Sequence, residues 1–313
     1  MPRYLVTGGA GFIGSHIAEA LLARGESVRI LDDLSTGYQQ NLAHLEGEIE
    51  FLQGDVRDNA LVARAVEGVE VVFHQAALAS VHRSLSEPQK THAVCATGTL
   101  ILLEQARQAG VRRFLYAASS SAYGDQLKAC QTEKDLTVPV SPYAASKLAG
   151  EHYCRSFYRA YGLETVCLRY FNVFGPRQDP DSPYSAVIPL FIGAMLNGKQ
   201  PVVFGDGEQS RDFVFVKDIV HGNLLAAEAE GVAGRVINLA TGKKISLLEL
   251  IAHLNEMLGL DVEPIHQPAR EGDVRHSLAD ISLAKDVLGY EPTFSLAEGL
   301  QQSIDYYRTL VDG

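Results

Sequence analysis

Residues 4–14 read YLVTGGAGFIG, an apolar run followed at once by a glycine-rich stretch. Three of its glycines, Gly8, Gly11 and Gly14, are spaced three residues apart, and a helical pattern of apolar residues opens near Phe12. Glycines at this spacing allow a tight turn from strand to helix and let the backbone approach a pyrophosphate at the positive end of the helix. The stretch therefore predicts a dinucleotide-binding turn, and the alternative is a glycine-rich turn without a ligand.

The first half of the chain alternates short apolar runs with helical patterns. The helix after the glycines has apolar residues every fourth position and a natural stop at Gly25. The runs that we expect to be strands are residues 4–6, 28–31, 49–52, 69–73, 114–117 and 165–168. This alternation of strand and helix patterns is typical of a parallel sheet with helical crossovers. The sequence therefore predicts a doubly wound α/β fold of the Rossmann type.

The sequence pattern changes after about residue 171, where prolines and glycines interrupt short apolar runs. We expect a smaller, loop-rich C-terminal lobe to begin there. The predicted dinucleotide-binding domain is 1–170 with a returning segment near 213–240, and the predicted second lobe is 171–212 and 241–313.

Composition narrows the class of protein. The 313 residues carry a formal net charge of −11 and are 46% hydrophobic, which argues against binding nucleic acid or an anionic membrane surface. Glycines interrupt the apolar N-terminus and no apolar stretch is long enough to span a bilayer, so we expect a soluble, cytoplasmic protein. The four cysteines lie far apart and the ten histidines show no paired metal spacing, so we expect reduced thiols and no metal.

An acidic residue ends the second apolar run. Asp32 stands where a carboxylate can accept both hydroxyls of an adenosine ribose, which favours NAD as the cofactor. Asp33 beside it would repel a 2'-phosphate. Asp55, after the third run, is a second candidate, for the adenine edge. Each acid could instead be a solvated loop residue or a turn former.

Tyr143 and Lys147 lie four residues apart in SPYAASK, so a helix would place them on one face. A phenol with a pKa of about 10 is a weak base at neutral pH, and lowering that pKa by roughly 3 takes about 4 kcal/mol. The Lys147 ammonium and an oxidised nicotinamide ring could supply it. Ser119, just past the run at 114–117, would lie at the carboxyl edge of the sheet and could share the substrate hydroxyl. A Tyr and a Lys at this spacing are otherwise common on helix surfaces.

The stretches TGGAGFIG, SSSAYG, SPYAASK and RYFNVFGP, with the Asp32-Asp33 pair, resemble the extended short-chain dehydrogenase/reductase family over nearly the whole chain. The resemblance implies that Ser119 is the catalytic serine, Tyr143 the base and Lys147 the lysine that binds the cofactor ribose and tunes the tyrosine. The chain carries Cys95 where members of the family usually carry Asn. The NAD contacts that we expect are Gly8, Gly11, Phe12, Ile13, Gly14, Asp32, Asp33, Asp55, Val56, Gln75, Ala76, Ala77, Tyr143 and Lys147.

The string SSSAYG helps to place the chain within the family. Dehydratases of the family carry an acidic pair between the catalytic hydroxyl and the Tyr-Gly, and uronic-acid decarboxylases carry a Glu, whereas this string carries no acid. Elimination of water would lack its usual proton donor, so the chain is more similar to the UDP-hexose 4-epimerases, which act through a 4-keto sugar. A dehydratase, a reductase and a non-catalytic NAD-binding sensor stay open as alternatives.

The resemblance to these epimerases also implies a set of substrate contacts. Asn172, Arg211 and Arg270 match pyrophosphate- and phosphate-binding residues, although the arginines could be ordinary surface charges. Ser277, four residues past Asp273, matches a position in the sugar pocket unless it packs elsewhere. A small residue there leaves room for a 2-acetamido group, which favours UDP-N-acetylglucosamine and UDP-N-acetylgalactosamine, with UDP-glucose and UDP-galactose as slower substrates. The predicted substrate contacts are Ala79, Ser80, Ser119, Asn172, Ala186, Val202, Phe204, Arg211, Arg270, Asp273 and Ser277.

The resemblance finally implies an assembly. Members of the family form homodimers through two helices per subunit, which would be the helix near Thr99 to Ala109 and the helix that carries Tyr143. We therefore expect a homodimer whose other partner is the UDP-sugar itself.

Overall fold

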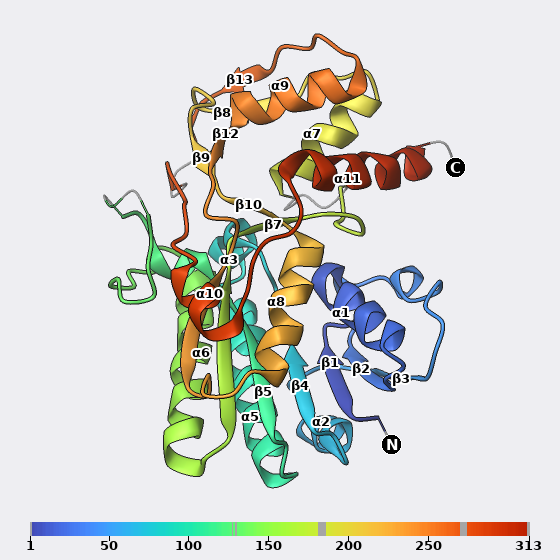
Figure 1. Ribbon diagram of the computed structural model, residues 1–313, viewed down its shortest axis with the longest axis vertical. Coiled ribbons are helices and arrows are strands. Elements are labelled where there is room, and N and C mark those ends of the chain that lie inside the picture. The colour runs from blue at the N-terminus through green and yellow to red at the C-terminus, as the bar shows by residue number, and fades with distance from the viewer. Residues whose placement is uncertain (1, 127, 129, 181–185, 270–273, 312–313) are drawn as a thin grey trace.

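The computed structural model of the protein describes residues 2–126, 128, 130–180, 186–269 and 274–311. A central sheet is covered by helices on both faces, and a smaller group of elements lies beyond one end of it (Figure 1). No helix in these described ranges has the length and apolar composition needed to cross a membrane.

Seven parallel strands form the central sheet in the order β11-β6-β5-β4-β1-β2-β3. These strands are β1 (Tyr4–Thr7), β2 (Val28–Asp32), β3 (Ile49–Gln53), β4 (Val71–His74), β5 (Arg113–Ser119), β6 (Glu164–Tyr170) and β11 (Arg235–Leu239). The predicted doubly wound α/β fold is confirmed. The strand order reverses between β1 and β4, and ligands of such sheets bind outside the carboxyl ends of the strands at this reversal.

The residues of β1 explain why the sheet is covered on both faces. All four of its side chains are buried, as in a strand with helices on each side. Val6 packs in one apolar cluster with Ile17, whereas Leu5 packs in a second cluster with Leu102. Helices of the first face are α1 (Phe12–Ala23), α8 (Val216–Glu228) and α10 (Ser282–Leu288), and those of the second are α2 (Asn59–Val66), α5 (Thr99–Gln108) and α6 (Pro142–Tyr161) (Figure 1).

Short helical elements lie in the connections between the strands of the sheet. They are the 3₁₀ helices η1 (Gln39–Asn41) and η3 (Ser120–Tyr123), the π-helix η2 (Ala93–Gly98), and the helices α3 (Val81–Ser86) and α4 (Pro88–His92). Cys95, which replaces the usual Asn, lies buried within the π-helix. Cys154 and Cys167 are also buried, and Cys130 is half-buried; all four are free thiols.

The smaller lobe has an apolar core of its own, which includes Phe174, Phe191, Phe215, Leu250 and Ile304. Its helices are α7 (Val187–Leu196), α9 (Leu247–Leu258) and α11 (Leu296–Val311). Its strands form the pairs β7 (Asn172–Phe174) with β10 (Phe213–Phe215), β8 (Val202–Phe204) with β13 (Ile265–Gln267), and β9 (Ser210–Arg211) with β12 (Ile245–Ser246). From β10 the chain returns through α8 to β11 in the large sheet. The predicted domain boundaries themselves stay a prediction.

The buried carboxylate of Asp212, which lies between β9 and β10, binds two other segments of the chain. Asp212 is fully buried, and it accepts hydrogen bonds from the Thr241 backbone N–H (2.9 Å) and hydroxyl (2.6 Å), from Gly242 N–H (3.0 Å) and from Ala279 N–H (3.2 Å). Burial raises the pKa of Asp212 and these hydrogen bonds lower it. The carboxylate is thus the shared acceptor that holds the ends of three loops together.

Replacing Asp212 with Ala should lower the free energy of unfolding by about 3 kcal/mol, because buried donors then lose their acceptor. Urea denaturation monitored by circular dichroism measures this change. Asp206→Ala is the control, since Asp206 is exposed and pairs with exposed Arg275, and it should change the free energy of unfolding far less than Asp212→Ala does. Equal losses in the two variants would contradict this account of the junction.

Candidate active site

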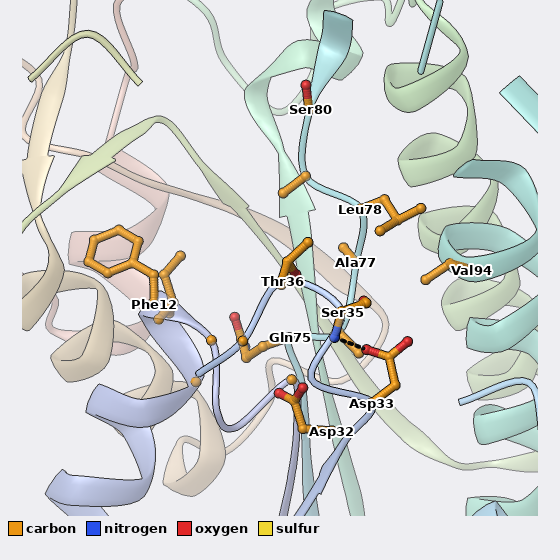
Figure 2. Close-up of a pocket in the computed structure, with 18 of the residues that line it drawn as sticks. Phe12, Asp32, Asp33, Ser35, Thr36, Gln75, Ala77, Leu78, Ser80 and Val94 are labelled. Carbon is orange, nitrogen blue, oxygen red and sulfur yellow. Dashed lines mark hydrogen bonds between the residues drawn. The ribbon is translucent and has the colours of Figure 1, made fainter. Parts of the chain in front are cut away.

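A cavity of about 700 Å³ opens at the carboxyl ends of the sheet strands. Every residue that the sequence predicts as an NAD contact lines this cavity, which we call the cofactor cavity. Figure 2 shows that Phe12, Asp32, Gln75 and Ala77 reach it from α1, β2 and the loop after β4. Segments far apart in the chain therefore meet here, although the role of each residue in binding stays a prediction.

The glycine turn fits a close approach of backbone to ligand. Gly8 has φ +67°, and a Cβ on it would lie 2.7 Å from the backbone nitrogen of Ala76. A Cβ on Gly14 would lie 2.1 Å from the carbonyl oxygen of Gly8. Backbone atoms therefore exclude side chains at these two positions and let the turn pack tightly. Gly8, Gly11 and Gly14 line the cavity at the N-terminus of α1. An anion is favoured at that end of a helix.

Two backbone groups fix the orientation of the Asp32 carboxylate. Its oxygens accept the N–H groups of Ala10 (2.9 Å) and Leu34 (2.9 Å). Burial raises the pKa of Asp32, and the two hydrogen bonds oppose that effect. Asp33 is exposed and accepts the N–H of Ser35 (2.9 Å), as the dashed line in Figure 2 marks. Asp32, and not the exposed Asp33, is therefore the buried and oriented carboxylate at the edge of the cavity.

Asp55 also lines the cofactor cavity, but its carboxylate has a local partner. It accepts the backbone N–H of Arg57 (2.8 Å) and is paired with the Arg57 guanidinium (2.9 Å), which lowers the pKa of Asp55. This geometry is that of a turn former, the alternative that the sequence left open, at a position that still borders the cavity.

Helix α6 carries the predicted base and its lysine. The helix begins after Ser141, whose hydroxyl accepts the N–H of Ala144 (3.2 Å). Gly150 lets the helix lie close to β5, since a Cβ there would be 2.2 Å from the Tyr116 hydroxyl. The Lys147 Nζ is buried, donates to the Ala117 carbonyl (2.8 Å) and lies 5.0 Å from the centre of the Tyr116 ring.

Burial dominates the electrostatics of Tyr143. It raises the pKa of the Tyr143 phenol, while a hydrogen bond with Ser119 lowers it. Burial also lowers the pKa of Lys147. The predicted fall in the Tyr143 pKa depends on the charge of an oxidised nicotinamide as well as on Lys147, and it stays a prediction. Because a buried phenolate is costly, an additional positive charge is needed to form it at neutral pH.

Ser119 is the last residue of β5 rather than a residue beyond the strand. Its hydroxyl oxygen accepts hydrogen bonds from the Ser121 backbone (3.2 Å) and hydroxyl (2.8 Å) at the start of η3. Ala117 and Ala118, its neighbours, line the cofactor cavity, whereas Ser119 is half-buried beside Tyr143. The structure thus brings the three predicted catalytic residues together at the end of β5 and the start of α6.

A second cavity of about 350 Å³ lies in the smaller lobe. Ala186 borders it and the cofactor cavity alike, so the two share a wall. Of the predicted substrate contacts, Ala79 and Ser80 line the cofactor cavity, and those that line the second cavity are Asn172, Ala186, Val202, Phe204 and Arg211.

Ser277 lines neither of these two cavities. Its backbone N–H donates to the Ser210 carbonyl (3.0 Å), and the side chain is half-buried. The alternative of packing elsewhere therefore fits this position better. Arg270 and Asp273 lie outside the described residues.

The residues of the cofactor cavity that were not predicted include Arg83, Tyr170 and Arg177. The Tyr170 hydroxyl donates to the Asn223 side chain (2.9 Å) and accepts from the Gln75 amide (3.1 Å). Arg177 has φ +66° and pairs with Glu19 on α1. Its place directly after RYFNVFGP could have drawn attention to it, but its partners come only from the folded chain.

Comparison with known proteins shows the family. The family model described as "NAD dependent epimerase/dehydratase family" matches residues 4–240. The chain belongs to the NAD dependent epimerase/dehydratase family. The predicted resemblance to extended short-chain dehydrogenases/reductases is thereby confirmed, and so is NAD as the cofactor of the family.

Individual members of the NAD dependent epimerase/dehydratase family match over nearly their full length. A UDP-glucose 4-epimerase of Mycolicibacterium smegmatis is 40% identical, over 98% of this chain and 98% of the relative. A UDP-glucuronate 4-epimerase of Thermodesulfobacterium geofontis is 33% identical, over 100% and 98%. The structure of a UDP-N-acetylglucosamine 4-epimerase from Methanobrevibacter ruminantium M1, in complex with UDP-N-acetylmuramic acid, has a TM-score of 0.94 and 40% identity, over 99% of each chain.

The residues present fit the cofactor of this family. The side-chain-free turn at Gly8 and Gly14 would receive the pyrophosphate, and the Asp32 carboxylate would receive the adenosine ribose. The cavity is within the usual size range of small-molecule sites. Among the described residues, no three His, Cys, Asp or Glu side chains gather in a way that would hold a metal ion.

Asp32→Asn should raise the dissociation constant for NAD by about ten- to a hundredfold, because it removes the charge that strengthens the ribose hydrogen bonds. Isothermal titration calorimetry on protein freed of endogenous cofactor measures this constant. Glu46→Gln, at an exposed residue that does not line the cofactor cavity, is the control and should change this constant less than about threefold. The same weakening in the two variants would contradict the assignment of Asp32.

Proposed function

We propose that the protein is an NAD-dependent UDP-sugar 4-epimerase that prefers UDP-N-acetylglucosamine and UDP-N-acetylgalactosamine and acts more slowly on UDP-glucose and UDP-galactose. The observation that carries the proposal is the placement of Tyr143 and Lys147, one helical turn apart, on the wall of the cofactor cavity beside Ser119. The 4-epimerases among the relatives support it.

The chain's own residues account for the proton transfers. Tyr143 accepts the proton of the sugar 4-hydroxyl and later returns it to the 4-keto oxygen, and Ser119 shares that oxygen. The Lys147 ammonium, anchored on the Ala117 carbonyl, stabilises the phenolate form of Tyr143. When bound, NAD supplies the hydride acceptor and donor for carbon 4. Return of the hydride to the other face of the turned sugar gives the 4-epimer.

The second cavity offers a suitable place for the UDP group. Val202 and Phe204 provide apolar and aromatic surface, and Asn172 and Arg211 provide polar groups. The Arg211 guanidinium donates to the Ser210 carbonyl (3.0 Å), which holds its side chain at the wall of the cavity. The shared wall at Ala186 would let a sugar diphosphate extend from this cavity toward Tyr143.

The preference for acetylated sugars is supported by small side chains. Ala79, Ser80 and Ala186 border the cofactor cavity and take up little space. The M. ruminantium structure is of an enzyme named for UDP-N-acetylglucosamine, and it binds a related acetylated sugar. Ser277 does not support the preference for acetylated sugars, because it lines neither cavity.

We also propose that the protein is a homodimer joined through α5 and α6, as the family resemblance implies. Three tyrosines on α6 support an interface there, since Tyr153, Tyr158 and Tyr161 are exposed by 36%, 38% and 59%. Aromatic side chains are enriched at the cores of protein interfaces.

Tyr143→Phe should lower the rate of epimerisation by about 100- to 10,000-fold, because the variant lacks the general base, while NAD binding stays nearly unchanged. Liquid chromatography measures conversion of UDP-N-acetylglucosamine to UDP-N-acetylgalactosamine without added NADH. Tyr153→Phe, on the same helix and half-exposed, is the matched control and should retain activity. Full activity in Tyr143→Phe would refute the mechanism, and a 4-keto-6-deoxy product would identify a dehydratase instead.

A further inference from the structure

A third ionisable residue follows Tyr143 and Lys147 on the same face of α6. Glu151 lies one turn beyond Lys147, and its carboxylate is 3% exposed. It forms two parallel hydrogen bonds with the Arg169 guanidinium, at 2.8 Å from Nε and 2.7 Å from Nη2. Arg169 is itself 5% exposed, so the chain buries this ion pair on the helix that carries the predicted base, two turns from Tyr143.

Arg169 also contacts the element that follows Ser119. In the sheet it lies opposite Ala118, the residue before Ser119. Its guanidinium carbon is 4.6 Å from the centre of the Tyr123 ring, and Tyr123 closes the turn η3. The Tyr123 hydroxyl donates to the Asn238 side chain (2.7 Å), which fixes the ring. One guanidinium thus contacts the helix of Tyr143 and Lys147 through Glu151, and the turn after Ser119 through Tyr123.

Stability alone does not explain this pair. The Nη1 atom of Arg169 is buried and has no hydrogen-bond partner of good geometry in the part of the chain that the structure describes, although the guanidinium also lies against the Tyr123 side chain. Burying two charges is costly even when they are paired, and apolar replacements of similar volume are often neutral or stabilising. A pair that is buried with one donor unsatisfied needs another explanation, such as a role at a functional site.

The pair also contributes a charged group, the Glu151 carboxylate, to the surroundings of Lys147. The groups that face Lys147 are Tyr143, Glu151 and Cys154 on α6, Cys95 on η2, His74 on β4 and Tyr116 on β5. Burial lowers the pKa of His74 to about 3, so this imidazole is neutral at physiological pH. Glu151 is the carboxylate in this set. Burial lowers the pKa of Lys147, and Cys95, Cys154 and Glu151, in that order, raise it.

We propose that Glu151 and Arg169 are positioning residues for the reaction, which hold the helix of Tyr143 and Lys147 against the turn after Ser119 and keep a negative charge beside the lysine. The proposal rests on the proposed function and adds two residues to it. Neither residue lines the cofactor cavity or the second cavity, so each acts through the groups that do.

Glu151→Gln tests the electrostatic half of the proposal. Removing a negative charge lowers the pKa of every nearby group, so the acidic limb, set by Tyr143, and the basic limb, set by Lys147, should each move to lower pH. We expect a shift of about 0.5 to 1 pH unit in the pH profile of kcat. The maximal kcat should fall about tenfold, because the reacting groups are held less tightly.

Arg169→Lys tests the geometric half. It keeps a positive charge but loses the two-pronged contact with Glu151 and the contact with the Tyr123 ring. We expect a lower kcat with both limbs of the pH profile unmoved. If either variant fails to fold, the paired replacement of Glu151 by Leu and Arg169 by Met removes both charges together, and it should fold and show the loss of kcat.

Glu164→Gln is the matched control. It disrupts the pair of Glu164 with Arg113 (2.6 Å), which joins β5 and β6 at their first residues, away from the carboxyl ends. Its pH profile and kcat should equal those of the wild type. If Glu151→Gln and the paired replacement also match the wild type, the positioning role is refuted.

Failure of the proposed function can be distinguished from failure of the positioning role. Wild-type protein that epimerises no UDP-sugar would refute that function, and a ¹³C NMR titration of the Tyr143 ring then decides the positioning role. In that titration Glu151→Gln should lower the pKa of Tyr143, and an unchanged pKa would refute the role.

Discussion

The rest of the site depends on the interactions of the Lys147 ammonium. It is buried, held by the Ala117 carbonyl at 2.8 Å and placed one helical turn from Tyr143. Burial works against both charged forms, the ammonium and the phenolate, so each needs the other or a further partner. If Tyr143 is the base, as proposed, it becomes effective only when the positive charge beside it is complete, which would link proton transfer to occupation of the cofactor cavity.

The fold supplies the precision that this arrangement needs. Ala117 and Ser119 come from β5, and Tyr143 and Lys147 come from the helix that lies against it, with Gly150 allowing the close approach. Rigid elements rather than loops therefore set the distances among the reacting groups. The buried pair of Glu151 and Arg169 extends the same logic one turn further along α6.

Local features were predictable from the sequence because they are contiguous. The turn at Gly8 lies between a strand and a helix that adjoin it, and Asp32 ends its own strand. The spacing of Tyr143 and Lys147 fixes their common face on any helix. The network of Gln75, Tyr170 and Asn223 was not predictable, since its members are far apart in the chain and meet only after the sheet forms.

Other features could not be read from the sequence, for identifiable physical reasons. Ser277 was matched to the sugar pocket from a short stretch, and its position depends on the hydrogen bond between its backbone N–H and the Ser210 carbonyl. Arg177 was not predicted as a site residue, and its left-handed backbone conformation is one that composition does not indicate for an arginine. The charged neighbours of Tyr143 were visible in the sequence, whereas its degree of burial was not.

The most direct test is the ionisation of Tyr143 followed by ¹³C NMR of tyrosine-labelled protein, with and without NAD⁺, using Tyr143→Phe to assign the resonance. The account predicts a pKa above the ordinary tyrosine value of about 10 in the cofactor-free protein. It predicts a fall of about 3 or more once NAD⁺ is bound, because a positive charge is added beside the phenol. A Tyr143 pKa that is the same in both states would contradict the account.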